Sequence, residues 1–363
     1  MNHPASTTNP PLKVDSHLWQ ACRRGLFQFN PEQAHHLAFA GLKLWQKCGA
    51  HQPILPQWTR HPSLTTKKWG LHFPNPVGLA AGLDKDGEAI LAFQALGFGF
   101  VEVGTVTPRP QPGNPKPRLF RLPESQAVIN RMGFNNQGAD ALVRRIARVR
   151  ETGKLSIPLG INIGKNAKTP IEDAMNDYLM GFKTVRDFAD FLVVNVSSPN
   201  TKNLRTLQQA TRLKIILEAL QEENQKGTPV PLLVKMSPDL QTADCVRSLE
   251  TAVDAGFQGA IISNTTISRD GIPNAERYGD GGMSGAPLFD ASTKKLKEIV
   301  QHFRDSPIDF IGVGGVMNGE QAVEKRAAGA ELVQAYTGFI YGGPTFAAQL
   351  CEALVTETKR LTS

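Results

Sequence analysis

The stretch FLVVNVSSPNT, residues 191–201, is an apolar run that ends in a turn rich in hydroxyl and amide groups. The apolar part, Phe191 to Val194, predicts a buried strand, and the Ser-Ser-Pro-Asn turn after it places polar side chains where that strand ends. Taken alone, the pattern is typical of an ordinary strand exit. Its meaning for the fold comes from similar runs elsewhere in the chain.

From residue 70 onward, short apolar or β-branched runs alternate with helical patterns eight times. The predicted strands are Val77 to Gly82, Phe100 to Val106, Pro158 to Gly164, Phe191 to Ser197, Pro231 to Ser237, Gly259 to Thr265, Phe310 to Val316 and Leu332 to Gly338. The predicted helices include Asp86 to Leu96, Gln137 to Arg150, Pro170 to Val185, Thr206 to Glu223, Thr242 to Ala255, Ala291 to Phe303, Gly319 to Ala328 and Pro344 to Leu361. Eight such units predict an α/β fold of the TIM (β/α)8 barrel class.

The first 66 residues are predicted to form an N-terminal helical extension, and residues 67–363 to form the barrel. Residues 1–70 hold eight Lys or Arg, two acidic residues and all four tryptophans, so they carry six of the seven net positive charges. Helices are predicted over Ser16 to Phe27 and after Asn30-Pro31, where Pro takes the first helical position. The Pro-rich lead-in, Met1 to Leu12, is predicted to be disordered.

A basic, Trp-bearing, amphipathic extension favours peripheral contact with anionic membrane headgroups. Nucleic acid is second to the membrane as an anionic partner of this segment. Docking of its apolar face on the barrel is the structural alternative to membrane contact or to the mouth of an apolar tunnel. The longest apolar stretch, Leu37 to Leu42, is too short to span a bilayer, and the polar start does not resemble a signal peptide. The four cysteines show neither a metal-ligand spacing nor a secreted disulfide pattern, so we expect no metal and a reducing compartment.

Polar residues gather at the carboxyl ends of the predicted strands, which is the ligand-binding face of this fold. Glycines after the seventh strand, and Tyr336-Thr337-Gly338 at the end of the eighth, predict a phosphate site. Lys235 ends an apolar strand and requires an anionic partner, which a reduced flavin could supply. Several asparagines suit a planar pyrimidine, although each alone is typical of a turn. The long loop Thr107 to Asn136 is predicted to be a lid or binding loop.

Together these residues resemble the class 2, quinone-dependent dihydroorotate dehydrogenases. The resemblance extends over residues 15 to 355 and is carried by the segments GLAAGLDKDG (78–87), TVTPRPQPGN (105–114), NRMGFNN (130–136), NIGKN (162–166) and the SSPN turn (197–200). It implies one FMN per chain, oxidation of (S)-dihydroorotate to orotate in pyrimidine biosynthesis, and re-oxidation by ubiquinone or menaquinone. It also implies a monomer on the cytoplasmic face of a bacterial inner membrane, with no nucleic-acid partner.

The resemblance also implies residue roles. Ser198 would be the base that removes the C5 proton while hydride passes from C6 to flavin N5, with Thr201 and a water as its relay. The expected substrate contacts are Lys85, Asn130, Arg131, Met132, Gly133, Phe134, Asn195, Asn200, Asn264 and Thr265. The expected FMN contacts are Ala81, Gly82, Leu83, Asp84, Lys85, Thr105, Asn162, Asn195, Lys235, Ser263, Gly285, Gly314, Gly315, Tyr336 and Thr337. His35, Arg121 and Tyr336 resemble groups near the quinone, and a place on the helix surface is the alternative for His35.

Two other functions stay open on the sequence. One is a different FMN-dependent barrel enzyme, or a class 1 enzyme that uses fumarate or NAD, although class 1 relatives resemble Ser-Cys-Pro-Asn where this chain has Ser198. The other is a membrane-docking protein whose barrel has lost activity. Retention of Lys85, Ser198 and Lys235 disfavours the second alternative.

Overall fold

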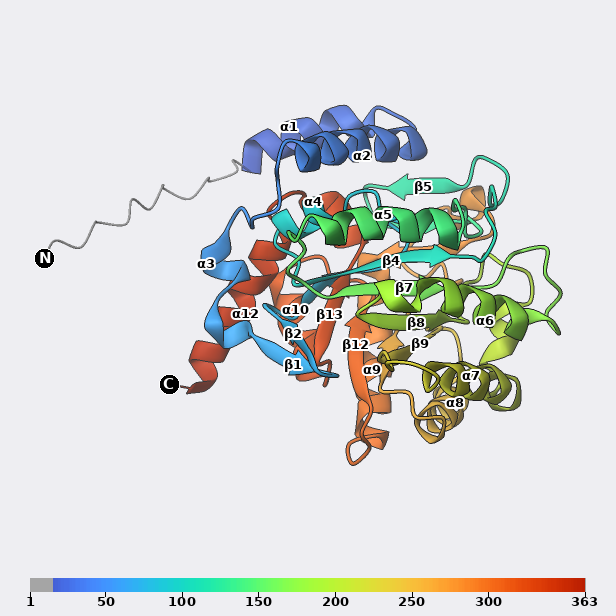
Figure 1. Ribbon diagram of the computed structural model, residues 1–363. Helices are drawn as coiled ribbons and strands as arrows, with labels where there is room; N and C mark the ends of the chain where they lie inside the picture. Colours follow the sequence, from blue (N-terminus) through green and yellow to red (C-terminus); the bar gives the residue numbers. More distant parts are fainter. Residues whose placement is uncertain (1–15, 363) are drawn as a thin grey trace, which may run out of the picture.

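Eight parallel strands close into a barrel in the computed structural model, which describes residues 16–362 (Figure 1). Their order around the barrel is β10-β12-β13-β3-β4-β7-β8-β9. Their bounds are β3 (Val77–Leu79), β4 (Phe100–Val106), β7 (Leu159–Ile163), β8 (Phe191–Asn195), β9 (Leu232–Met236), β10 (Gly259–Ile262), β12 (Asp309–Val313) and β13 (Leu332–Ala335). The predicted TIM barrel is confirmed, with most strands ending earlier than expected. The predicted lead-in at residues 1–12 lies outside the described residues.

A helix follows each barrel strand and packs on the outside. These helices are α4 (Ile90–Ala95), α5 (Ala139–Glu151), α6 (Ala174–Val185), α7 (Ala210–Asn224), α8 (Thr242–Asp254), α9 (Phe289–His302), α10 (Gly319–Ala327) and α12 (Phe346–Thr362). Short 3-10 helices lie at η1 (Pro62–Leu64), η2 (Arg186–Phe188), η3 (Leu204–Gln208), η4 (Ala275–Tyr278) and η5 (Ala286–Leu288). The predicted helix over 206–223 is therefore divided between η3 and α7.

Two of the boundaries that differ from prediction have local reasons. The first helix begins at Ile90 instead of Asp86, because the Asp84 carboxylate accepts the backbone N–H groups of Glu88 and Ala89, both at 2.8 Å, and holds a turn ahead of the helix. The eighth strand ends at Ala335, and residues 337–342 form a short helix, α11 (Thr337–Gly342). Residues 336–338 therefore form a strand-to-helix junction.

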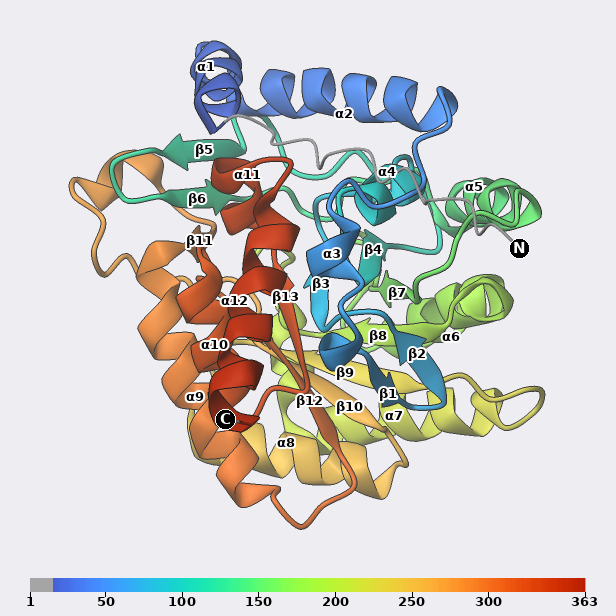
Figure 2. The ribbon, with the colours of Figure 1, turned by 90° about the vertical axis from the view of Figure 1, so that its left-hand side faces the viewer.

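Aromatic side chains fill the barrel interior. Phe73, Phe100 and Phe191 are fully buried, and the Phe100 ring meets that of Phe73 edge-on at 5.5 Å. Gly78 makes room for Phe100, since a Cβ at that position would lie 2.2 Å from the ring. A hairpin that the sequence did not reveal, β1 (Thr66–Lys68) and β2 (Leu71–Phe73), brings Phe73 and Trp69 to this cluster (Figure 2). The interior is thus a packed core without room for a ligand, and the barrel mouth is left as the place where one can bind to the barrel.

The predicted lid over the barrel is a small folded sheet. Within the loop 107–136, β5 (Leu119–Leu122) pairs with β6 (Ala127–Asn130), and β6 pairs in turn with β11 (Gly282–Gly285). All pairs are antiparallel, and the order is β11-β6-β5. The sheet joins segments from two distant parts of the chain, so backbone pairing supports the lid residues.

The extension folds as a helical pair, α1 (Ser16–Phe27) and α2 (Pro31–Lys47), as predicted, and lies along one side of the barrel (Figures 1 and 2). Asn30 caps α2, because its side chain accepts the Glu32 N–H at 2.9 Å. A short helix, α3 (Pro56–Thr59), then leads to the hairpin. The structure does not test the predicted boundary at residue 66, which stays a prediction. Across residues 16–362, no helix has the combined length and apolar character needed to cross a membrane.

Two arginines of the lid segment hold the extension. Arg118 donates to Glu32 Oε1 at 2.7 Å in a buried ion pair, and Lys116 lies 3.4 Å from the same oxygen. Burial raises the pKa of Glu32, but these two cations outweigh burial and hold it below its ordinary value. Arg121 donates to the carbonyls of residues 26, 27 and 29 and lies over the Phe27 ring. Helices α1 and α2 are therefore attached to the lid sheet by charge as well as by apolar packing.

Candidate functional site

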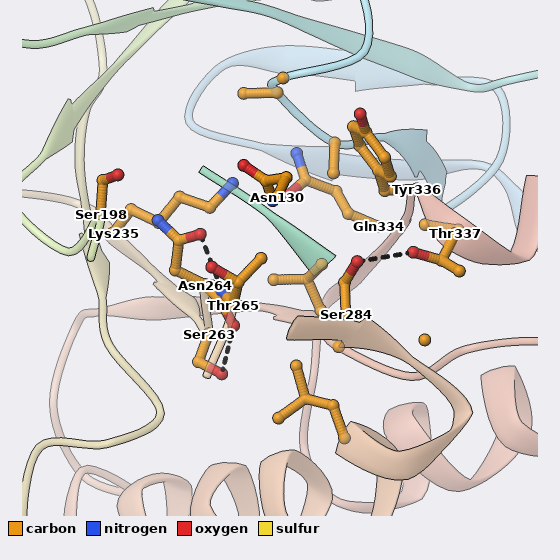
Figure 3. Close-up of a pocket in the computed structure, with 18 of the residues that line it drawn as sticks. Asn130, Ser198, Lys235, Ser263, Asn264, Thr265, Ser284, Gln334, Tyr336 and Thr337 are labelled. Atoms are coloured by element: carbon orange, nitrogen blue, oxygen red, sulfur yellow. Dashed lines mark hydrogen bonds between the residues drawn. The ribbon is translucent and has the colours of Figure 1, made fainter. Parts of the chain in front are cut away.

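A cavity opens at the carboxyl ends of the barrel strands. It brings together most of the residues that the sequence analysis assigned to substrate and FMN. Those that line it are Ala81, Gly82, Lys85, Thr105, Asn130, Met132, Gly133, Phe134, Asn195, Ser198, Asn200, Lys235, Ser263, Asn264, Thr265, Gly285, Gly314, Gly315, Tyr336 and Thr337. Figure 3 shows Ser198 and Lys235 on one side and Ser284 and Thr337 on the opposite side.

Four assigned residues do not line this cavity. Leu83 lines a second cavity, described below. Asp84 caps the turn before α4, and burial raises its pKa to about 6. The Arg131 side chain donates to the carbonyls of Tyr278 and Asp280 at 2.6 and 3.0 Å, so it supports the lid. Asn162 is fully buried below the cavity. Direct ligand contacts of these four residues stay predictions.

A buried carboxylate, Glu102, lies beneath the cavity floor. Glu102 is 0% exposed; its Oε1 accepts Asn162 Nδ2 at 2.6 Å, and its Oε2 accepts Gln334 Nε2 at 2.6 Å. Lys235 Nζ lies 3.6 Å from Oε2. A reduced flavin was the expected anionic partner of Lys235, and the carboxylate of Glu102 was not predicted. One glutamate inside the apolar run 100–106 was the available signal, because an unpaired charge is rarely buried.

Hydrogen bonds fix the asparagines at the strand ends. Thr105 Oγ1 donates to Asn162 Oδ1 at 2.5 Å and accepts Asn195 Nδ2 at 2.9 Å. Ser197 Oγ donates to Asn195 Oδ1 at 3.0 Å and accepts Asn264 Nδ2 at 2.9 Å. The network joins β4, β7, β8 and the loop after β10. The asparagines are thus held in place before any ligand binds.

The Ser198 turn meets the lid. Ser198 is buried, and its Oγ accepts the Asn200 N–H at 3.2 Å. Asn200 Nδ2 donates to Asn130 Oδ1 of the lid at 3.0 Å. The buried Thr201 Oγ1 has no hydrogen-bond partner among the described residues. Lys85 Nζ donates to Gly82 O at 2.6 Å, and burial lowers its pKa to about 8. One hydroxyl, several amides and an ammonium therefore converge on one side of the cavity.

The opposite side is built from glycines and hydroxyls. Thr337 Oγ1 lies 2.8 Å from Ser284 Oγ (Figure 3). Gly315 has φ +76°, and a Cβ there would lie 2.4 Å from the Phe289 backbone nitrogen, so only glycine fits without displacing α9. Backbone amides and hydroxyls without side-chain bulk are suited to a phosphate group.

A second cavity lies between the extension and the barrel. Its walls are mostly apolar, and the three residues assigned to the quinone, His35, Arg121 and Tyr336, all line it. His35 packs against Phe39 with ring centroids 4.3 Å apart, and burial lowers its pKa to about 3, so its ring is neutral at pH 7. Tyr336 lines both cavities. The apolar cavity thus reaches the polar cavity at one side chain.

The residues of the first cavity fit FMN. Gln334 lines this cavity, and its buried Oε1 has no hydrogen-bond partner among the described residues, so it can accept a hydrogen bond from a bound molecule. Amides, Lys235 and Gln334 match a flat ring with alternating donors and acceptors, and the glycine side matches a phosphate. For the same residues 16–362, no cluster of His, Cys, Asp or Glu has the arrangement of a metal site.

Comparisons with known proteins agree with this geometry. The model of a family described as dihydroorotate dehydrogenase matches residues 63–357. A relative named dihydroorotate dehydrogenase (quinone), from Burkholderia pseudomallei (strain 668), is 48% identical over 347 residues, which cover 93% of this chain and 98% of the relative. The relative of the same name from Burkholderia mallei (strain SAVP1) has the same identity and coverage.

Solved structures give the same match. The crystal structure of DHODH in complex with ferulenol from Eimeria tenella superposes with a TM-score of 0.85 at 38% identity, covering 94% of this chain and 95% of that chain. The ligand-free DHODH from the same organism superposes with a TM-score of 0.82 at 38% identity, covering 91% and 96%.

We expect Glu102→Gln to destabilise the protein by about 3 kcal/mol or more, because it leaves the Lys235 ammonium buried without its counter-charge. Urea unfolding measures the loss. Glu331→Gln is the control, since Glu331 also pairs with a lysine, at 3.2 Å, but its side chain is 40% exposed. The control should lose under about 1 kcal/mol. Equal losses in the two variants would contradict a structural role for the buried carboxylate.

Proposed function

The chain belongs to the family of quinone-dependent dihydroorotate dehydrogenases, oxidoreductases of pyrimidine biosynthesis, and on that premise we propose that one FMN per chain links its two cavities. The observation that carries the proposal is the meeting of a polar cavity and an apolar cavity at Tyr336. Dihydroorotate binds in the first cavity, and quinone binds in the second. The quinone-dependent relatives contradict the class 1 alternative.

The residues of the first cavity divide into two groups. The glycine side, with Gly285, Gly315 and Thr337, holds the FMN phosphate, and Lys235 and Gln334 bind polar edges of the ring. When bound, FMN supplies the hydride acceptor for the substrate and the electron donor for the quinone. The remaining amides, with Lys85, bind and orient the substrate ring and its carboxylate.

Ser198 acts as the base in this proposal. It removes the proton from C5 of dihydroorotate, and the C5–C6 double bond of orotate forms as hydride leaves C6. A free serine hydroxyl is a weak base at neutral pH, so its own proton needs an acceptor. The unpartnered Thr201 Oγ1 supports Thr201 as the first member of such a relay. The bond from Asn200 to Asn130 supports exclusion of water by the lid.

Helices α1 and α2 form the quinone access in this proposal. The apolar walls of the second cavity suit an isoprenoid quinone, and the neutral His35 ring adds a polar group without a charge. Large apolar side chains also face outward here, with Phe29 47%, Leu37 48% and Leu44 64% exposed. Together with the basic charge of the extension, they support peripheral binding to an anionic membrane surface. The family resemblance adds to the proposal a monomer on the cytoplasmic face of a bacterial cell membrane.

The central test is anaerobic mixing of the purified, flavin-containing protein with dihydroorotate while flavin absorbance is followed. Wild type should bleach rapidly, and Ser198→Ala should keep its flavin but bleach roughly a hundredfold more slowly or worse, because the proton acceptor is gone. Ser198→Cys supplies a more acidic proton acceptor, so part of the bleaching rate should return. The increase of this rate with pH should also occur at a lower pH than in wild type. Equal rates in wild type and Ser198→Ala would remove Ser198 from the mechanism. Wild type that never bleaches would support the inactive-barrel alternative.

Ala38→Trp tests the quinone cavity, because Ala38 lies in its lining on α2. The larger side chain should raise the KM for quinone by about tenfold through steric exclusion. Reduction of the flavin by dihydroorotate should not change, since that step takes place in the other cavity. Ala40→Trp, on an exposed position of the same helix, is the matched control. Equal losses in both half-reactions would indicate misfolding instead.

The outward-facing leucines test membrane contact. Replacing Leu37 and Leu44 together with serine should weaken binding to anionic vesicles by about tenfold or more, because two apolar side chains no longer insert. Met180→Ser with Ile215→Ser is the control, since these residues are 47% and 58% exposed on barrel helices. Wild-type binding should also weaken with salt. If the two double variants bind vesicles equally in a sedimentation assay, this face of α2 is not the surface that contacts the membrane.

A further inference from the structure

Lys325 on α10 is a lysine that no step described so far uses. It is 0% exposed, and its ammonium donates one hydrogen bond, to Ser292 Oγ at 2.7 Å. No ion pair links it to a carboxylate among the described residues, and burial lowers its pKa to about 7 against the opposing field of Glu324. The Phe289 ring centroid lies 5.3 Å from Nζ. Burial of an ammonium without a counter-ion is costly, so the position requires an explanation.

The partner of Lys325 leads to the glycine side of the first cavity. Ser292 Oγ lies 2.9 Å from Gly314 O and 3.0 Å from Phe289 O, and it can donate to either. The Gly314 carbonyl belongs to the same peptide group as the Gly315 N–H. A hydrogen bond accepted by that carbonyl therefore polarises the N–H on the other side of the peptide. Gly314 and Gly315 both line the cavity.

The glycine side has no cation of its own in the lining. Two lysines line the cavity, and both are engaged elsewhere: Lys85 donates to Gly82 O, and Lys235 lies near Glu102. Figure 3 shows Lys235 on the side opposite Ser284 and Thr337. A phosphate at the glycine side would meet only neutral groups directly. Hydrogen bonds through Ser292 link the Gly314 carbonyl on this side to the Lys325 ammonium.

We propose that Lys325 is a positioning residue for the cofactor phosphate. Through Ser292 it orients and polarises the Gly314–Gly315 peptide, and its ammonium offsets the phosphate charge from behind the loop. The inference rests on the proposed function, because it requires a cofactor that carries a phosphate. It deepens that function by assigning the source of positive charge in a site whose lining is neutral.

A purely structural role for Lys325 makes a different prediction. If the side chain only fills space beside Phe289, its loss loosens the loop for any flavin. Riboflavin has the same ring and ribityl chain as FMN but no phosphate. The preference for FMN over riboflavin therefore measures what the hydrogen bonds from Lys325 through Ser292 contribute to phosphate binding.

The experiment equilibrates the flavin-containing protein with mixtures of FMN and riboflavin, separates bound from free flavin by gel filtration, and quantifies the bound flavins. We expect Lys325→Met to reduce the preference for FMN by about tenfold, the size of one charged hydrogen-bond contribution. Ser292→Ala should reduce the preference for FMN similarly, because the substitution removes the same hydrogen bonds between Lys325 and Gly314. The double variant should lose no more than the larger single loss.

Lys165→Met is the matched control. Lys165 is 2% exposed and donates only to backbone carbonyls, those of Asn166 and Thr169 at 2.9 and 2.6 Å. This variant also removes a buried ammonium, and it should leave the preference unchanged. Should Lys325→Met fail to fold, Ser292→Ala alone decides.

The outcomes separate this inference from the proposed function. A wild type that prefers FMN, with unchanged preference in Lys325→Met and Ser292→Ala, overturns the role of Lys325 and leaves the cofactor assignment intact. A wild type without any preference overturns the cofactor assignment and this inference with it. A loss of the preference for FMN in both Lys325→Met and Ser292→Ala, but not in Lys165→Met, supports the inference.

Discussion

A carboxylate buried at the centre of the barrel organises the site above it. Glu102 on β4 holds donors from three other strands, through Asn162 on β7, Lys235 on β9 and Gln334 on β13. A buried charge is tolerated only when its hydrogen-bonding capacity is met, so these strands must keep their register at this level. The floor of the cavity is therefore rigid, and the ammonium of Lys235 keeps one orientation before any ligand arrives.

The two cavities allow two chemically different molecules to use one protein without meeting. Dihydroorotate is polar and charged, and it suits amides and lysines; a quinone is apolar, and it suits the walls between α1, α2 and the barrel. Tyr336, at the junction of β13 and α11, lines both. In the proposed function, electrons cross this boundary although neither molecule does, and the polar and apolar pockets therefore need to adjoin, as they do at Tyr336.

Much of the fold could be predicted because the barrel strands are apolar runs, and the polar residues that follow them locate the mouth, although most strands end before the predicted residue. Two local boundaries could not be predicted. The carboxylate of Asp84 holds a turn where the pattern predicts helix, and a helix begins at Thr337 where the pattern predicts strand. Glu102 and Lys325 were missed for a different reason. Their partners, Gln334 and Ser292, are 232 and 33 residues away in sequence. The apolar run around Glu102 marks that carboxylate as unusual, but the identity of a partner so far away is set by tertiary packing and leaves no local pattern.

Arg121 holds the turn between α1 and α2 by backbone carbonyls, those of residues 26, 27 and 29. In the opposite direction, two side chains of α1, those of Trp19 and Arg23, donate to the backbone carbonyl of Tyr341 on α11. Every residue carries a backbone carbonyl, so attachments of this kind depend little on which side chains occupy the accepting positions. Changes of side chain at the accepting positions 26 and 29 therefore leave these hydrogen bonds possible, so the helical pair can keep its place on the barrel.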